Sequence, residues 1–284
     1  MLKDNQLTGE IKKLFPARKP ESHKGDYGKL FVHAGSAGML GAALLCSRGA
    51  LRVGAGLVYL GVPLEVRDAV NLATPEVIVI GGAGAGEYLA VALGSTAVAL
   101  GPGLGQRRAL ARELLFKLSE AGFGCPVVLD ADGLNAFAGE LPALQKLQLK
   151  LILTPHPGEM ARLWGRKVEE VEQDRQKIAL ETARLLGCVV VLKGHQTVVV
   201  DAAGASYINN TGNPGMAGGG SGDVLTGMIA GLAAQGAAPR AAAVAGVYLH
   251  GLAGDLAAKE KGEYGMIASD LVDHIPEAIL TFDF

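Results

Sequence analysis

The sequence predicts an α/β fold with a central, mostly parallel sheet and helices on both faces. Short runs of β-branched residues alternate with amphipathic stretches along most of the 284 residues, the pattern of strands joined by crossover helices. Hydrophobic residues make up 49% of the chain, which suits a sheet that is buried on both faces. The 41 glycines supply the tight turns that many short connections need.

The expected strands are short apolar runs between turn signals. The last two runs differ from the others, because only Gly194, His195 and Gln196 separate them. Three residues cannot form a crossover helix, so these runs should pair as an antiparallel hairpin. Strands are predicted at residues 29–34, 57–62, 77–80, 97–100, 127–130, 151–154, 189–193 and 197–201.

Helices are expected where apolar residues recur every three or four positions. They are predicted at residues 39–53, 107–121, 158–164, 168–186, 221–234 and 240–259, with a last one after Ser269. The sequence contains no internal repeat, low-complexity block or linker rich in proline or serine. We therefore expect a single domain over residues 25–284, preceded by an N-terminal extension of residues 1–24.

Composition and charge argue against several classes of protein. The net charge is −2, the 26 basic residues are scattered, and only 5% of residues are aromatic, so no nucleic-acid partner is expected. Cys46, Cys125 and Cys188 lie far apart without neighbouring histidines, which argues against a zinc site and favours a reducing compartment. We find no signal peptide and no apolar run of about 18 residues, so we expect a cytoplasmic protein without a membrane partner.

The most informative segment covers residues 209–228 and has the sequence NNTGNPGMAGGGSGDVLTGM. Its glycines let backbone amides approach a ligand, and they lead into the predicted helix. Phosphate is favoured at such a helix start, so Gly220, Ser221 and Gly222 are candidate nucleotide-binding residues. Asp223, in the first turn, is a candidate general base. The alternative is a mobile loop followed by an acid that only favours the helix start. The spacing is not that of a Walker loop.

The predicted hairpin offers a second phosphate site in the segment VLKGHQT. Lys193 ends a buried strand, Gly194, His195 and Gln196 form the turn, and Thr197 adds a hydroxyl. The lysine and the turn amides could receive the phosphates of a nucleotide, or the turn could be a solvated hairpin tip. His195 is expected to be exposed rather than catalytic.

Two other segments place polar residues where strands end, and open α/β sheets bind ligands at that edge. In LTPHPGEM, His156 could hydrogen-bond a polar substrate, while Glu159 is expected to complement a helix start. In VVLDADGLN, Asp130 and Asp132 end a strand and Asn135 follows one helical turn later. Their oxygens could hold Mg²⁺ through water, or they could cap the next helix.

Two glycine-rich turns offer space for a flat ligand. The segment LGPGLGQ follows a strand, but it lacks the full spacing of a dinucleotide fingerprint. We expect Gly103 to let a substrate pack against the backbone instead. Gly41 and Ala42, in the first long helix, leave room for a ligand, although helix packing explains these small residues equally well.

Together these segments resemble the carbohydrate-kinase-type domain of the NAD(P)H-hydrate dehydratase family. The resemblance covers Gly25 to the C-terminus and implies a ribokinase-like fold and a lyase reaction. Family members use ADP (bacteria and archaea) or ATP (eukaryotes) to dehydrate the S epimer of hydrated NADH or NADPH, by phosphorylating the ring hydroxyl and expelling phosphate. The motifs, in the family's order, are KGDYGKLFVHAGS, GAALLCSRGALRVGAGLV, GPGLG, LDADGLN, LTPHPGEMARL, LKGHQTVV and GNPGMAGGGSGDVLTG.

The resemblance also implies roles for individual residues. Asp223 would be the catalytic base and would contact the substrate, and the amides of Gly220 to Gly222 would stabilise the transferring phosphoryl group. Ala42, Gly103 and His156 would contact the hydrated cofactor. Mg²⁺ would sit on the nucleotide phosphates, through water on Asp130 or Asn135. The nucleotide would be held by Lys193, Gly194, His195, Gln196, Thr197, Gly220, Ser221 and Gly222.

The family also suggests partners. An epimerase that interconverts the R and S hydrates is often fused ahead of this domain, and only about two dozen residues precede it here. We therefore expect a separate epimerase chain and, from this unfused architecture, ADP rather than ATP. Family members often form homotetramers, so a homo-oligomer is expected.

Two alternatives remain open. A small-molecule kinase of the same superfamily, of the hydroxyethylthiazole or hydroxymethylpyrimidine kinase type, would share the glycine loop and the acid. The segments TPHPGEM and GNPGMAGGGSGD match the dehydratases more closely. A nucleotide-binding regulatory protein could keep the fold without the chemistry, although the presence of Asp223 argues against it.

Overall fold

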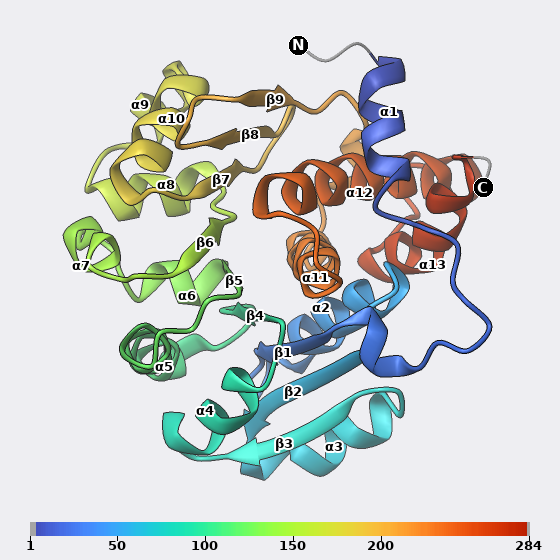
Figure 1. The fold of residues 1–284 in the computed structure, drawn as a ribbon. Helices are drawn as coiled ribbons and strands as arrows, with labels where there is room; N and C mark the ends of the chain where they lie inside the picture. Colours follow the sequence, from blue (N-terminus) through green and yellow to red (C-terminus); the bar gives the residue numbers. More distant parts are fainter. Residues whose placement is uncertain (1–3, 283–284) are drawn as a thin grey trace.

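The central sheet has the predicted architecture. The computed structural model describes residues 4–282, where nine strands form one sheet in the order β3-β2-β1-β4-β5-β6-β7-β8-β9 (Figure 1). The pairings among β1 to β7 are parallel, whereas β8 and β9 each pair antiparallel with the preceding strand. These pairings confirm the mostly parallel sheet and the hairpin. The strands are β1 (Lys29–His33), β2 (Leu57–Pro63), β3 (Ile78–Gly82), β4 (Ala97–Leu100), β5 (Pro126–Leu129), β6 (Lys150–Leu153), β7 (Val189–Leu192), β8 (Val198–Asp201) and β9 (Ser206–Ile208).

Helices cover both faces of this sheet, as predicted. Because side chains alternate along a strand, Leu30 and Val32 of β1 join one apolar cluster and Phe31 joins the other. The first cluster lies under α2, α11, α12 and α13, and the second under α4, α5, α8 and α10. The helices are α1 (Asp4–Lys12), α2 (Leu40–Arg52), α3 (Arg67–Ala73), α4 (Ala85–Leu93), α5 (Arg108–Glu120), α6 (Ala131–Asn135), α7 (Leu141–Gln145), α8 (Pro157–Trp164), α9 (Val168–Gln173), α10 (Arg175–Leu186), α11 (Ser221–Ala234), α12 (Pro239–Lys261) and α13 (Ala268–Leu280).

Helices α2 and α11 pack so closely that their backbones are in direct contact. A Cβ atom added at Gly49 would lie 2.6 Å from the carbonyl oxygen of Val224, and one added at Gly227 would lie 1.9 Å from that of Cys46. No side chain fits in either gap, so both positions require glycine. The contact fixes the first turns of α11, which begins at the glycine-rich loop, against α2.

Helix α12, with 23 residues, is the longest helix of the described chain. Its length and composition would suffice to cross a membrane, but 67% of its apolar window is buried inside the protein. It packs against α11, α13 and the strands β6 to β8. Burial in the core therefore accounts for its apolar composition.

The helix predicted over residues 168–186 is two helices, so this prediction is wrong in its continuity. At Asp174 the backbone leaves the helical conformation, with φ −148° and ψ 78°. The Asp174 carboxylate accepts a hydrogen bond from the Lys177 amide at 3.1 Å and so caps a new helix, α10. An aspartate in the middle of a helical pattern was the signal for this break.

Several short elements were not predicted. Strand β9 has only three residues, and α3 and α4 begin without a side-chain cap, so the usual start signal is missing. Helix α1 lies in the predicted N-terminal extension, and its Leu7 and Ile11 are buried in the first apolar cluster. The domain boundary at residue 25 stays a prediction.

Candidate active site

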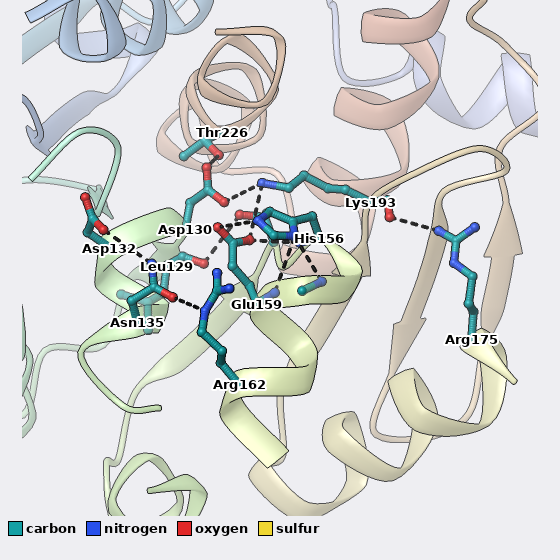
Figure 2. A network of polar contacts seen from close by, with 12 residues as sticks. Leu129, Asp130, Asp132, Asn135, His156, Glu159, Arg162, Arg175, Lys193 and Thr226 are labelled. Carbon is teal, nitrogen blue, oxygen red and sulfur yellow. Dashed lines mark hydrogen bonds and ion pairs between the residues drawn. The ribbon is translucent and has the colours of Figure 1, made fainter. Parts of the chain in front are cut away.

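The predicted site residues gather where β5, β6 and β7 end and α11 begins. Asp130 directly follows β5, and His156 follows β6 and caps α8. Lys193 directly follows β7. Because β5, β6 and β7 are parallel, their carboxyl ends lie at one edge of the sheet. Figure 2 shows the side chains from these elements pointing toward one another.

Asp130 is the centre of this group. It is 1% exposed, and one carboxylate oxygen lies 2.6 Å from the Lys193 ammonium. The other oxygen accepts a hydrogen bond from the Thr226 hydroxyl of α11 at 2.7 Å. A buried carboxylate thus has a partner for each oxygen and joins the hairpin to α11 (Figure 2).

Glu159 extends the group from α8. Its Oε2 lies 3.9 Å from the Lys193 ammonium and accepts a hydrogen bond from the His156 backbone amide at 2.8 Å. The His156 Nδ1 in turn accepts from the amides of Gly158 and Glu159. This reciprocal capping box confirms the structural role predicted for Glu159.

His156 is held more firmly than the sequence suggested. With Nδ1 occupied as an acceptor, its Nε2 faces Glu159 Oε1 at 3.3 Å. Both ring nitrogens therefore have protein partners, although the ring lines the neighbouring cavity. Burial, followed by the charges of Lys193 and Arg162, lowers the pKa of His156. Its predicted contact with substrate stays a prediction.

Asp223 lies in the first turn of α11 and differs from Asp130. Within the described residues its carboxylate accepts no hydrogen bond. Its pKa is raised to about 6, mainly by burial and also by the charge of Asp130, although Lys193 opposes the shift. A carboxylate with this pKa is mostly ionised at pH 7 and can take up a proton.

The glycine-rich loop before Asp223 leaves backbone amides available. Gly220 has φ +94° and caps α11 without a side chain, a conformation that favours glycine. A Cβ atom at Gly218 or Gly219 would meet nothing within 4 Å, and one at Gly222 would lie 3.3 Å from the Lys193 ammonium. The start of α11 therefore faces the lysine at the end of β7.

A cavity of about 680 Å³ opens beside this point. The predicted nucleotide-binding residues line it, with the exception of Gly220. His195 is exposed at its rim, as predicted. Apolar side chains of Leu225, Met216 and Val247 form another part of its wall. The predicted residues on the lining are Lys193, Gly194, His195, Gln196, Thr197, Ser221 and Gly222.

The structure also brings the two predicted small residues together, outside this cavity. A Cβ atom at Gly103 would lie 2.8 Å from the Cβ of Ala42. One turn along α2 from Ala42 lies the buried Cys46, whose pKa is raised by burial and also by the charges of Asp223 and Asp130. Cys46 faces α11, because its carbonyl oxygen would lie 1.9 Å from a Cβ atom at Gly227, and Ala42 lies one turn away on the same face of α2.

The predicted metal ligands already have protein partners. Both oxygens of Asp130 are engaged, as described above. Asn135 accepts a hydrogen bond from Arg162 at 2.8 Å and lies 3.3 Å from Asp132. Among the described residues, no group of three or more His, Cys, Asp or Glu side chains could hold a metal ion. A direct ligand role for Asp130 or Asn135 stays a prediction that these contacts do not favour.

Three residues of this region were not identified from the sequence. Thr226 donates a hydrogen bond to Asp130. Arg175 donates to carbonyl groups of the hairpin turn. His250 of α12 lies with Nε2 2.9 Å from the Ser221 carbonyl oxygen, and burial lowers its pKa to about 4. The neutral ring thus donates to the first residue of α11. A lone histidine in an alanine-rich helix gives no sequence signal for this contact.

Comparisons with known proteins point to one family. A family model described as NAD(P)H-hydrate dehydratase matches residues 30–277. A relative from Neisseria meningitidis serogroup B, named ADP-dependent (S)-NAD(P)H-hydrate dehydratase, is 40% identical over 91% of this chain and 87% of its own length. A relative from Moorella thermoacetica, named bifunctional NAD(P)H-hydrate repair enzyme, is 44% identical over 92% of this chain and 51% of its own. The chain spans about half the length of such longer relatives.

Solved structures extend the likeness to three dimensions. A Bacillus subtilis protein described as an ADP/ATP-dependent NAD(P)H-hydrate dehydratase, co-crystallised with ATP and Mg²⁺, superposes with a TM-score of 0.83 at 35% identity, covering 97% of each chain. A ribokinase-like superfamily protein from Enterococcus faecalis superposes with a TM-score of 0.84 at 25% identity, covering 97% of this chain and 94% of the other. These structures confirm the ribokinase-like fold.

Proposed function

This chain belongs to the NAD(P)H-hydrate dehydratase family, and from that premise we propose that it is an ADP-dependent (S)-NAD(P)H-hydrate dehydratase. It restores NADH or NADPH from the S form of the hydrate and releases AMP and phosphate. The observation that carries the proposal is the partly buried carboxylate of Asp223. Within the described residues it accepts no hydrogen bond, and it follows a glycine-rich loop that faces the ammonium group of Lys193.

The nucleotide would occupy the cavity between the hairpin turn and α11. Its phosphates would lie against Lys193, the turn amides and the start of α11, where the lysine charge and the free N–H group of Gly222 favour anions. The apolar wall formed by Leu225, Met216 and Val247 suits the base. The hydrated nicotinamide would lie on the other side of Asp223, against Ala42 and Gly103, with His156 at the boundary.

The chemistry follows from the poor leaving ability of hydroxide. Asp223 accepts the proton of the ring hydroxyl while the hydroxyl oxygen attacks the β-phosphorus of ADP, and AMP leaves with the electrons of the broken P–O bond. The amides from Gly220 to Gly222 stabilise the charge on the transferring group. The lone pair of the ring nitrogen then expels phosphate, and loss of a proton from the neighbouring ring carbon forms the double bond.

Mg²⁺ commonly accompanies nucleotide phosphates and neutralises their charge. The oxygens of Asp130 and Asn135 have protein partners, so the protein does not present a preformed ligand set for it. The ion would therefore be carried by the nucleotide rather than by these residues.

Partners and location are also part of the proposal. The longer relatives are named bifunctional, which supports a functional link to an NAD(P)H-hydrate epimerase. We further propose a homo-oligomer, with a tetramer as the form to test by light scattering, and a cytoplasmic location.

The test is a direct assay of recovery. Purified protein is mixed with (S)-NADH hydrate, Mg²⁺ and either ADP or ATP, and absorbance of the reduced nicotinamide is followed together with orthophosphate release. Equal recovery of NADH and phosphate with ADP would support the proposal, and a faster reaction with ATP would revise the nucleotide. No recovery with either nucleotide would overturn it and would favour a small-molecule kinase, which accumulates phosphorylated substrate instead.

A further inference from the structure

Arg175, the first residue of α10, lies directly behind the hairpin turn. Its side chain is 16% exposed. Its guanidinium donates to the carbonyl oxygens of Leu192 at 3.0 Å and Lys193 at 2.9 Å, and also to that of His195. Figure 2 shows it pointing at the backbone of Lys193 from the side opposite to the Lys193 side chain. One planar group thus gathers three carbonyl groups of the turn.

The directions of these carbonyls set the directions of the amides. In a trans peptide the C=O group and the next N–H group point in opposite directions, and the described residues include no cis bond. The Leu192 carbonyl shows the effect, because the following amide, that of Lys193, donates to Pro155 at 2.8 Å. Pro155 precedes His156, which lines the cavity. The turn residues Gly194 and Gln196 line the cavity and Arg175 does not, so the side away from Arg175 is the cavity side.

The same reasoning places two further amides. Because the carbonyls of Lys193 and His195 face Arg175, the amides of Gly194 and Gln196 point away from it. Within the described residues neither amide donates a hydrogen bond to the protein. Their backbones are held in the left-handed half of conformational space, with φ +134° and +54°, which is unusual for Gln196. Successive amides in such turns form anion-binding concavities.

We infer that Arg175 is a positioning residue for the nucleotide: by holding the carbonyls of the turn, it aims the amides of Gly194 and Gln196 at the phosphates. This inference rests on the proposed function. Gly194 and Gln196 line the cavity, whereas Arg175 does not. Arg175 acts through the backbone, and its charge adds a second attraction for an anion on the far side of the turn.

The arrangement is costly for a role in stability alone. The Nε of Arg175 is buried without a hydrogen-bond partner, and burial lowers the pKa of its guanidinium. The nearest carboxylate, that of the half-exposed Glu172, is 3.8 Å away. Desolvating a cation whose ion pair is long and half-exposed is unfavourable, so a function at the turn accounts for the residue better than stability does.

The test compares ADP with adenosine, which lacks the phosphates. Dissociation constants are measured by calorimetry for the unmodified protein, Arg175→Lys and a control, Arg112→Lys. Arg112 also donates to a backbone carbonyl, that of Ala136 at 3.0 Å, but on α5, away from the hairpin (Figure 1). We expect Arg175→Lys to weaken ADP by about tenfold or more, because lysine keeps the charge but not the planar fork. Adenosine affinity should stay within about twofold, and the control should bind both as before.

The outcomes separate this inference from the proposed function. If the unmodified protein binds ADP and Arg175→Lys binds it equally well, or loses ADP and adenosine alike, the positioning role is wrong and the proposed function stands. If the unmodified protein does not bind ADP, both the positioning role and the proposed function are wrong. As a second variant, Arg175→Ala is titrated with ADP in the presence and absence of millimolar guanidinium. Recovery of affinity with guanidinium, but not with sodium chloride of equal ionic strength, supports the role, and equal behaviour in the two salts contradicts it.

Discussion

Two carboxylates of the site, Asp130 at the end of β5 and Asp223 at the start of α11, have nearly opposite surroundings. Both are largely buried, but Asp130 has a partner for each oxygen, whereas Asp223 has no hydrogen-bond donor within the described residues and a pKa raised to about 6. Burial alone therefore does not define a reactive group. A buried acid with partners joins elements together, and one without partners is available for chemistry.

The largest expected effect is on stability, at Asp130. Replacement Asp130→Asn leaves the Lys193 ammonium buried beside a neutral amide, and removing one partner of a buried pair typically costs about 3–5 kcal/mol. Urea unfolding near neutral pH measures the loss. The control is Asp273→Asn, which breaks the exposed pair with Arg52 and should change stability by less than about 1 kcal/mol. Equal losses of stability in the two variants would show that the buried pair of Asp130 and Lys193 matters no more than an exposed pair.

The next effect is on turnover, at Asp223. Replacement Asp223→Asn removes the proton acceptor while keeping the size of the side chain, so turnover should fall by at least about a hundredfold. Affinity for ADP should stay within a few fold, because the amides and Lys193 are intact. The NADH recovery assay and calorimetry measure the two quantities. Full activity in this variant would show that another group accepts the proton.

The same variant should be more stable than the natural protein. The pKa of Asp223 is about 6 when folded against an ordinary 3.8, so the folded state binds this proton more tightly. The resulting stabilisation is present below pH 3.8 and is lost as pH rises through about 6. Asparagine avoids the cost of burying the charge, and we expect a gain of about 1–2 kcal/mol near pH 7.5, less than the roughly 3 kcal/mol that the full shift allows. Urea unfolding at several pH values should show the gain shrinking as pH falls; a gain independent of pH would contradict this.

The smallest effect is at Thr226, which supports Asp130. Replacement Thr226→Val keeps the shape and removes one hydrogen bond, so it should cost about 1 kcal/mol of stability. In a protein that already carries Asp130→Asn, the same replacement should cost clearly less, because the two changes disrupt one network. Four unfolding curves measure this coupling. Additive losses would mean that Thr226 acts independently of Asp130.

The two carboxylates also show how far sequence reasoning reaches. The strands were predictable because β-branched runs report burial locally, and Asp223 was predictable because glycine loop, helix start and acid are adjacent in the chain. The state of Asp130 was not, since its partner Thr226 is 96 positions away and gives no local signal. The sequence left open whether Asp130 holds Mg²⁺ through water or caps the next helix, and it gave no indication of the ammonium and hydroxyl partners that the fold supplies.

The role of Arg175 also gives no local signal in the sequence. The sequence prediction missed that Arg175 starts a helix, because it continued one helix through Asp174 instead of taking that aspartate as a cap. The role of Arg175 depends on which way three carbonyl groups point, and peptide orientation is fixed only by the folded turn. Motifs therefore identified the groups expected to touch ligands, but not the residues that orient them.

The glycines near the start of α11 differ in how freely they can be replaced. Gly49 and Gly227 are confined by backbone atoms of the opposite helix, so descendants of this chain can alter neither without moving the helix that carries Asp223. Gly218 and Gly219 are surrounded by open space and have no left-handed backbone that would exclude other residues. Related chains can therefore vary in the loop while the helix stays in register, and we expect more sequence variation at Gly218 and Gly219 than at Gly49 and Gly227.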